Sequence, residues 1–255
     1  MTVCYRYDGS LEGFLTCIFE SYAHREEAAA FVGPEDGLTL WQEREVVSQP
    51  DKARRVWEGL GKKTSPLFRA MIARGFLTCL PQRELLLYGL IRRGFGEGDR
   101  VRRDLADPAV AALTLALRKL STEEDHLKGF ARFSDVDGVL AGEIAPKNRV
   151  LPLLGPHFAA RFPNERLVLY DRTHREALFC AGGKRTILPV EDFQIGQAGE
   201  GERAFRRLWR DYFRTIAIEE RNNPTCQANH LPHRYRGVMT EFLPQDPELP
   251  PGAVS

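Results

Sequence analysis

Apolar positions in the first half of the chain recur mainly at helical spacing. From residue 11 onward they lie three or four residues apart, at Leu11, Phe14, Leu15, Ile18, Phe19 and Tyr22. Because one face of a helix repeats every 3.6 residues, this spacing predicts a helix over 11–25 with one buried face. Ser10 or Asp8 is the expected N-cap, since their side-chain oxygens can accept hydrogen bonds from the first free backbone N–H groups. A short strand is predicted just before it, over 2–7.

The remaining pattern predicts an α+β protein. A loop at 33–37, a connection at 94–104 and a turn at Asp137-Gly138 separate the predicted elements. Helices are predicted over 51–60, 65–79, 82–93 and 108–120, and a shorter one over 156–162 with Pro156 in its first turn. Strands are predicted over 38–47, 126–134, 138–144, 166–171 and 176–181. The expected architecture is a helical N-terminal half and a mainly antiparallel sheet with packed helices in the C-terminal half.

Length and composition place the chain among ordinary globular proteins. Its 255 residues, 43% of them hydrophobic, suit an N-terminal lobe over 1–100, an α+β core over 101–245 and a proline-containing tail over 246–255. No run approaches the roughly 20 apolar residues of a membrane span. The first residues also lack the basic and apolar regions of a secretory signal, so a cytoplasmic protein without membrane contact is expected.

The cysteines indicate reduced thiols rather than a metal centre. They stand at positions 4, 17, 79, 180 and 226, with no Cys-x-x-Cys pair among them. Zinc knuckles and iron–sulfur clusters use closely spaced cysteines, so neither a metal nor a cofactor is expected.

The charge of the whole chain is close to neutral. Its formal net charge of +1 excludes a uniformly cationic protein that coats nucleic acid. The basic residues comprise 29 Arg and 7 Lys, and arginine binds phosphate through two parallel hydrogen bonds. A GC-rich genome is the alternative explanation for the excess of arginine.

The segment 201–236 departs from this neutrality. It holds eight arginines and four carboxylates, a net charge of +4, which leaves −3 for the rest of the chain. On a helical wheel, five arginines point within roughly 40° of one direction and so form one face, and a sixth lies about 60° away. The five are Arg203, Arg207, Arg210, Arg214 and Arg221, and the sixth is Arg206. The opposite face is apolar, with Phe205, Leu208, Trp209, Tyr212, Phe213 and Ile216. This pattern predicts a helix whose apolar face packs in the core and whose arginines contact an anion. The alternative is a solvated face with local salt bridges.

The following run, 221–235, is rich in amides and imidazoles. Such side chains donate hydrogen bonds to base edges and phosphates, and the DNA-binding candidates here are Asn222, Asn223, Gln227, Asn229, His230, His233, Arg234 and Tyr235. A loop whose Asn and His side chains cap backbone groups is the alternative. No metal site is expected at His230 and His233, because no carboxylate stands at a partner spacing.

Candidate catalytic residues are few. His126, Arg132 and Asp171 fall on predicted strands and could converge on one site, although a structural role is the alternative for each. Phosphate-binding loops and the Gly-x-Ser-x-Gly nucleophile motif are absent from the sequence.

Four segments resemble a bacterial family described as DNA metabolism or repair proteins, whose core domain is one of unknown function. They are YDGSLEGFLTCIFE at 7–20, HLKGFARF at 126–133, PLLGPHFAARF at 152–162, and the stretch 208–235 that ends in LPHRY. Members are typically encoded beside a radical SAM protein thought to act in DNA modification or repair. A related domain occurs fused to uracil-DNA glycosylase-like domains. The resemblance therefore implies a role with DNA and a radical SAM partner, but it supplies no catalytic residues.

Three hypotheses follow. The first is a DNA-binding accessory protein in DNA repair or modification that acts with a radical SAM partner. The second is an enzyme that acts on a damaged or modified base in DNA, with the base flipped into a pocket. The third is a protein-interaction module whose arginines face an acidic partner without direct DNA binding.

Overall fold

The computed structural model describes residues 1–34, 36–37, 39–191, 193, 208, 231–237, 239 and 242. Contacts within the chain divide it into two compact units, 1–121 and 122–255, and each unit is considered by itself below. The domain boundary expected at residue 100 from the sequence stays a prediction.

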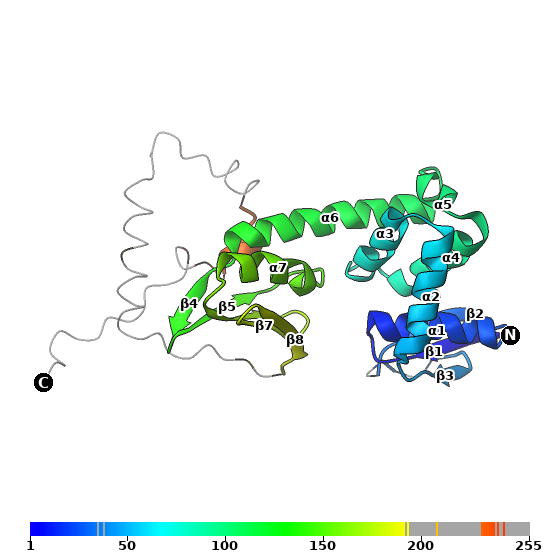
Figure 1. Ribbon diagram of the computed structural model, residues 1–255, viewed down its shortest axis with the longest axis horizontal. Coiled ribbons are helices and arrows are strands. Elements are labelled where there is room, and N and C mark those ends of the chain that lie inside the picture. Colours follow the sequence, from blue (N-terminus) through cyan, green and yellow to red (C-terminus); the bar gives the residue numbers. More distant parts are fainter. Residues whose placement is uncertain are drawn as a thin grey trace, which may run out of the picture. The chain divides into compact units, whose positions relative to one another are not determined.

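The first unit combines a small parallel sheet with several helices (Figure 1). Its strands are β1 (Thr2–Arg6), β2 (Glu27–Val32) and β3 (Glu43–Glu45), in the order β2-β1-β3, and both outer strands run parallel to β1. Its helices are α1 (Leu11–Ala23), α2 (Pro50–Lys63), α3 (Pro66–Phe76), α4 (Arg83–Glu97) and α5 (Arg100–Arg103). Helix α6 (Pro108–Phe130) begins in this unit and continues into the second.

Capping and packing explain how α1 is positioned on the sheet. The Ser10 side chain accepts a hydrogen bond from the Gly13 N–H, which confirms the predicted N-cap. Phe14 on α1 packs edge-on against Phe31 of β2, with ring centroids 5.0 Å apart, and stacks on Phe76 of α3 at 5.5 Å. Phe31 also contacts Tyr88 of α4 at 5.7 Å. One aromatic core therefore joins the sheet to three helices.

The second unit contains a five-stranded sheet with the order β4-β5-β6-β7-β8. Its elements are β4 (Phe133–Val136), β5 (Val139–Ile144), α7 (Leu151–Arg161), β6 (Arg166–Asp171), β7 (Glu176–Ala181), β8 (Lys184–Pro189) and α10 (His233–Arg236). Every neighbouring pair is antiparallel except β5 and β6, because α7 connects those two strands as a crossover. Helix α7 packs on β7 and β8, and Phe158 on α7 contacts Phe133 of β4 at 5.1 Å.

The α+β class is confirmed, with helices mostly in the first half and a mainly antiparallel sheet in the second. Several element predictions are wrong. The strand expected over 126–134 is helix α6 up to Phe130, and only Phe133–Val136 form a strand. Pro156 lies inside α7 rather than in its first turn, which holds Pro152. The strand expected over 38–47 is reduced to β3, and β2 and β8 are additional strands.

The cysteines that the structure describes form no disulfide bonds, as expected. Cys4, Cys17 and Cys180 are buried, whereas Cys79 is exposed. Cys226 lies outside the described residues. Among the helices that the structure describes, none is both long and apolar enough to cross a membrane.

Candidate functional site

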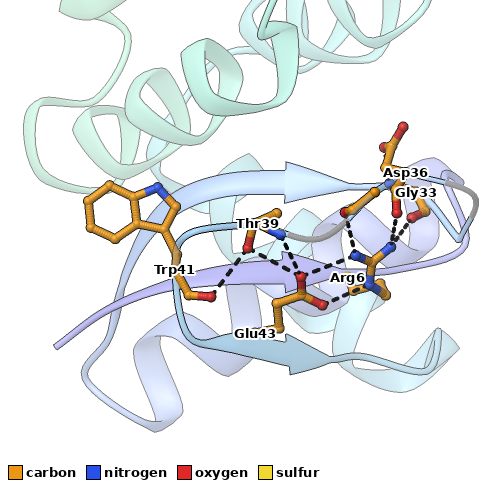
Figure 2. Close-up of polar contacts among 7 residues, drawn as sticks. Arg6, Gly33, Asp36, Thr39, Trp41 and Glu43 are labelled. Atoms are coloured by element: carbon orange, nitrogen blue, oxygen red, sulfur yellow. Dashed lines mark hydrogen bonds and ion pairs between the residues drawn. The ribbon is translucent and has the colours of Figure 1, made fainter.

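Arg6 closes a polar network at the carboxyl ends of the parallel strands, where ligands commonly bind in open α/β sheets. Figure 2 shows its guanidinium between Glu43 of β3 and the loop after β2. Nε and Nη2 donate to the two Glu43 carboxylate oxygens at 2.9 and 3.2 Å. Nη1 donates to the carbonyls of Gly33 and Asp36, and Nη2 also donates to that of Gly37. All five N–H groups of the guanidinium therefore have acceptors, and none is left for a ligand.

Glu43 is held ionised by the same network. Its carboxylate accepts hydrogen bonds from the Thr39 backbone N–H and hydroxyl, both at 3.2 Å. The hydrogen bonds from Arg6, followed by the backbone N–H of Thr39, lower the pKa of Glu43 to about 2. Because the pair is bidentate and uses every donor of the guanidinium, we interpret it as a structural link between β1, β3 and the 33–43 loop.

Asp8 lies between the first turns of two helices at the same end of the sheet. Its carboxylate accepts hydrogen bonds from the Ser10 N–H and hydroxyl at 2.9 and 2.7 Å, and from the Ser48 hydroxyl at 2.6 Å. Desolvation raises its pKa, but the hydroxyl hydrogen bonds prevail and hold the pKa below its ordinary value. A side chain at position 13 would collide with this cluster, since a Cβ there would lie 2.6 Å from the Ser48 oxygen. Gly13 in the YDGSLEGF segment thus permits the close approach of α1.

Glu123 is a buried carboxylate of the second unit that several donors share. Its side chain is 2% exposed on α6. One oxygen accepts a hydrogen bond from the Lys147 N–H at 3.0 Å, and the other accepts from the Asn148 N–H and side-chain amide at 2.8 and 2.6 Å. The Arg234 guanidinium lies 3.2 Å from the first oxygen. Glu123 therefore connects the loop after β5 to the short helix α10.

Tyr235 completes this connection with an aromatic cluster. Its ring lies 5.7 Å from His126 and 5.5 Å from Phe130, both on α6, and the residue is 3% exposed. The Arg234 side chain hydrogen-bonds the Tyr235 hydroxyl and also lies over its ring. Burial raises the pKa of Tyr235. These contacts give Tyr235 a structural role in packing α10 against α6, whereas the Arg234 side chain remains 39% exposed.

The three catalytic candidates occupy different environments. His126 is half-buried on α6, and its Nδ1 has no hydrogen-bond partner among the described residues. Arg132 follows α6 and donates to the Gly129 carbonyl at 2.9 Å. Asp171 is fully buried at the end of β6, where it accepts hydrogen bonds from the Thr173 and His174 N–H groups and lies 2.7 Å from His174 Nδ1. Asp171 therefore organises its own turn, and within the described chain no hydrogen bond or ion pair joins it to His126.

Most DNA-binding candidates lie outside the described residues. These are Arg203, Arg206, Arg207, Arg210, Arg214, Arg221, Asn222, Asn223, Gln227, Asn229 and His230, together with the side chain of His233. Their contact with DNA stays a prediction. In the part of the chain that the structure describes, no group of three or more His, Cys, Asp or Glu side chains is placed to hold a metal ion.

Glu123 is the important residue that the sequence reasoning overlooked. The sequence does contain a signal for it, because Leu113, Leu120 and Leu127 mark one stripe of α6 and Glu123 falls on that stripe between the last two. A carboxylate on an apolar stripe is seldom buried without partners. It therefore predicts a buried polar connection rather than a solvated face.

Comparison with known proteins gives one family match. The model of a domain of unknown function, DUF4130, matches residues 81–241, which is more than half of the chain. A search of curated proteins finds no match. The matched region includes α4, α6, the five-stranded sheet and the Glu123–Arg234 connection. The chain therefore belongs to the DUF4130 family, whose function is unknown.

Proposed function

We propose that this protein binds DNA as an accessory factor in DNA repair or modification and acts with a radical SAM partner. The observation that carries the proposal is the arginine-rich segment 201–236, which has a net charge of +4 on an otherwise acidic chain. Phosphate contacts of arginine and lysine supply most of the affinity of non-specific DNA binding. The resemblance to DNA metabolism or repair proteins supports the choice of DNA as the anion, and of a radical SAM protein as the partner.

The described end of this segment supports the proposal in a second way. Arg234 and Tyr235 are fixed to α6 by Glu123, His126 and Phe130. A binding segment that is attached to a folded body loses less conformational freedom when it meets its ligand. Helix α10, the described end of the segment, is thus held on the second unit.

The test is a DNA titration at two salt concentrations with a variant that lacks Arg207, Arg210 and Arg214. If about four arginines neutralise phosphates, the logarithm of the affinity for duplex DNA falls with the logarithm of salt concentration with a slope of about −3.6. The triple alanine variant should bind more weakly and show a flatter slope. A matched control removes three exposed cations of the first unit, Arg100, Arg103 and Lys119, and should retain more affinity. Equal affinity of wild type and the first variant would refute the arginine contact.

The same titration is repeated with a radical SAM protein of the kind that is typically encoded beside members of the resembled family. Tighter DNA binding by the pair than by either protein alone supports the accessory role. A stable complex of the two proteins that survives nuclease and high salt, with no DNA binding by either assembly, would instead select a protein-interaction module. Activity of the isolated chain on a modified oligonucleotide would select the enzyme hypothesis.

A further inference from the structure

The first unit carries an aromatic pocket where α1, α2 and α4 meet. Its volume is about 520 Å³, within the range of ligand-binding pockets. The lining consists of Phe19, Tyr22, Ala23, Arg55, Val56 and Phe95. Three aromatic rings and one cation therefore surround it, and no carboxylate is part of the lining. We refer to this site as the aromatic pocket.

The geometry of the rings leaves one of them open to solvent. Tyr22 and Phe95 meet edge to face, with centroids 5.8 Å apart and an interplanar angle of 81°. Tyr22 is nevertheless 48% exposed. Gly59 on α2 lies against the Phe95 ring, and a Cβ at position 59 would be in ordinary contact with it at 3.4 Å. The pocket is thus shaped by packing while part of its aromatic surface stays accessible.

Cations surround these rings. The Arg55 guanidinium lies 5.1 Å from the centre of the Phe19 ring, and the Lys52 ammonium lies 5.6 Å from it. Arg92 lies 5.7 Å from the centre of the Tyr22 ring. Lys52 and Arg92 are paired with Glu20 and Glu27, respectively. Arg55 is exposed, and among the described residues no ion pair joins it to a carboxylate, so its charge is available to a ligand.

Accessible aromatic rings beside an unpaired cation are typical of surfaces that bind single-stranded nucleic acid. Each base can stack on an aromatic ring or on the plane of an arginine, while neighbouring cations contact its phosphates. The bases of a duplex are already stacked on one another, so their faces are not accessible to such a pocket. The same features fit a neutral peptide less well, because Arg55, the cation of the lining, favours an anionic chain.

We propose that the aromatic pocket binds an unpaired base of single-stranded DNA together with its neighbouring phosphate. Tyr22 and Arg55 provide the stacking surfaces, and Arg55 with Arg92 contacts the phosphate. This inference rests on the DNA-binding function proposed above. It adds a second contact surface, in the first unit, and a preference for unpaired strands.

The test compares full-length wild type with Tyr22→Ala and Arg55→Ala in anisotropy titrations with a fluorescent deoxythymidine oligonucleotide. Both side chains are exposed, so the variants should keep the fold, which circular dichroism and thermal melting verify. Loss of one stacked base should weaken binding about 5- to 150-fold. Tyr22→Phe keeps the ring and should bind like wild type. Trp41→Ala removes another exposed aromatic of the same unit and serves as the matched control.

A second readout locates the base directly. An oligonucleotide that carries 5-iododeoxyuridine is photo-crosslinked to the protein, and mass spectrometry should find the adduct on a peptide with Tyr22 or Phe19. Duplex DNA of the same length should be insensitive to Tyr22→Ala.

The outcomes separate the two proposals. If wild type binds DNA and loses affinity in the Arg207/Arg210/Arg214 variant but not in Tyr22→Ala or Arg55→Ala, the aromatic pocket is refuted and the proposed function stands. If wild type binds no DNA, both are refuted. Tighter binding of the RNA counterpart, or competition by an unrelated acidic peptide at equal concentration, would also overturn the assignment of single-stranded DNA.

Discussion

Replacement of Glu123 by alanine should destabilise the second unit strongly, because this carboxylate is buried and shared. The substitution leaves the backbone N–H and the side-chain amide of Asn148 without their carboxylate acceptor, and Asn148 is only 4% exposed. A buried donor that loses its acceptor costs about 1–3 kcal/mol, and removal of one member of a buried charged network costs about 3–5 kcal/mol. Lys147 and Arg234 add less, since water can reach both. We therefore expect a loss of about 3–5 kcal/mol in the free energy of unfolding.

Urea denaturation followed by circular dichroism and tyrosine fluorescence measures this loss. With a slope of about 2 kcal/mol per molar urea, the unfolding midpoint of the second unit should fall by about 2 M. Because the chain has two units, the two probes are compared for separate transitions before a free energy is derived. Glu123→Gln provides a milder variant in case the alanine variant does not fold.

The control is Asp125→Ala, two residues along the same helix. Asp125 has a 73% exposed side chain and forms an ion pair at 3.3 Å with Lys128. An exposed pair at this spacing is worth about 0.3–0.5 kcal/mol. If Glu123→Ala and Asp125→Ala shift the midpoint equally, Glu123 does not connect the β5–α7 loop to α10, and the reasoning fails.

Three further predictions concern the first unit. Arg6 lowers the pKa of Glu43 in the folded state, so the contribution of Glu43 to stability is complete above the ordinary glutamate pKa and is lost as pH falls toward about 2. The difference in unfolding free energy between wild type and Glu43→Gln should therefore shrink over this pH range. A constant difference would contradict the ion pair. Gly13→Ala should lower stability by about 1–3 kcal/mol through overpacking, despite the better helix propensity of alanine. Gly89→Ala, where a Cβ meets nothing within 4 Å, should be neutral or stabilising in the same melts, and equal effects of the two would refute the close packing at position 13. Cys79, the exposed thiol, should be alkylated by iodoacetamide before the three buried described thiols, as peptide mapping can verify; simultaneous labelling would contradict their burial.

The sequence predicted those elements whose stabilising pattern is local. Helix α1 has both a regular apolar face and a serine cap, so its position and its N-cap could be predicted. Strands β6 and β7 have turn residues between them, and their predicted ranges agree with the structure. Strand β2 was missed because its three alanines carry little strand preference. Its place depends on pairing with β1, which is a tertiary contact.

The candidate site was harder to predict because its contacts join distant segments. The continuation of α6 to Phe130 was missed, since polar residues over 121–126 obscure its apolar stripe. Glu123 and Arg234 are 111 positions apart in the sequence, and no local spacing indicates that they meet. The aromatic pocket likewise combines α1, α2 and α4, so single-helix patterns reveal each wall but not the space between them.

The position of α4 affects which fragments of this chain can fold. The family match begins at residue 81, just before α4, yet Leu87, Leu90 and Ile91 of this helix are buried in the core of the first unit with residues from the first 80. A fragment that starts at residue 81 would expose this apolar face to water and should aggregate or recruit a substitute surface. A cut at the boundary between units would instead divide the continuous helix α6. The range that matches the family model, 81–241, is thus not a range that we expect to fold alone. In this chain the boundaries of the family match differ from the boundaries of the folded units.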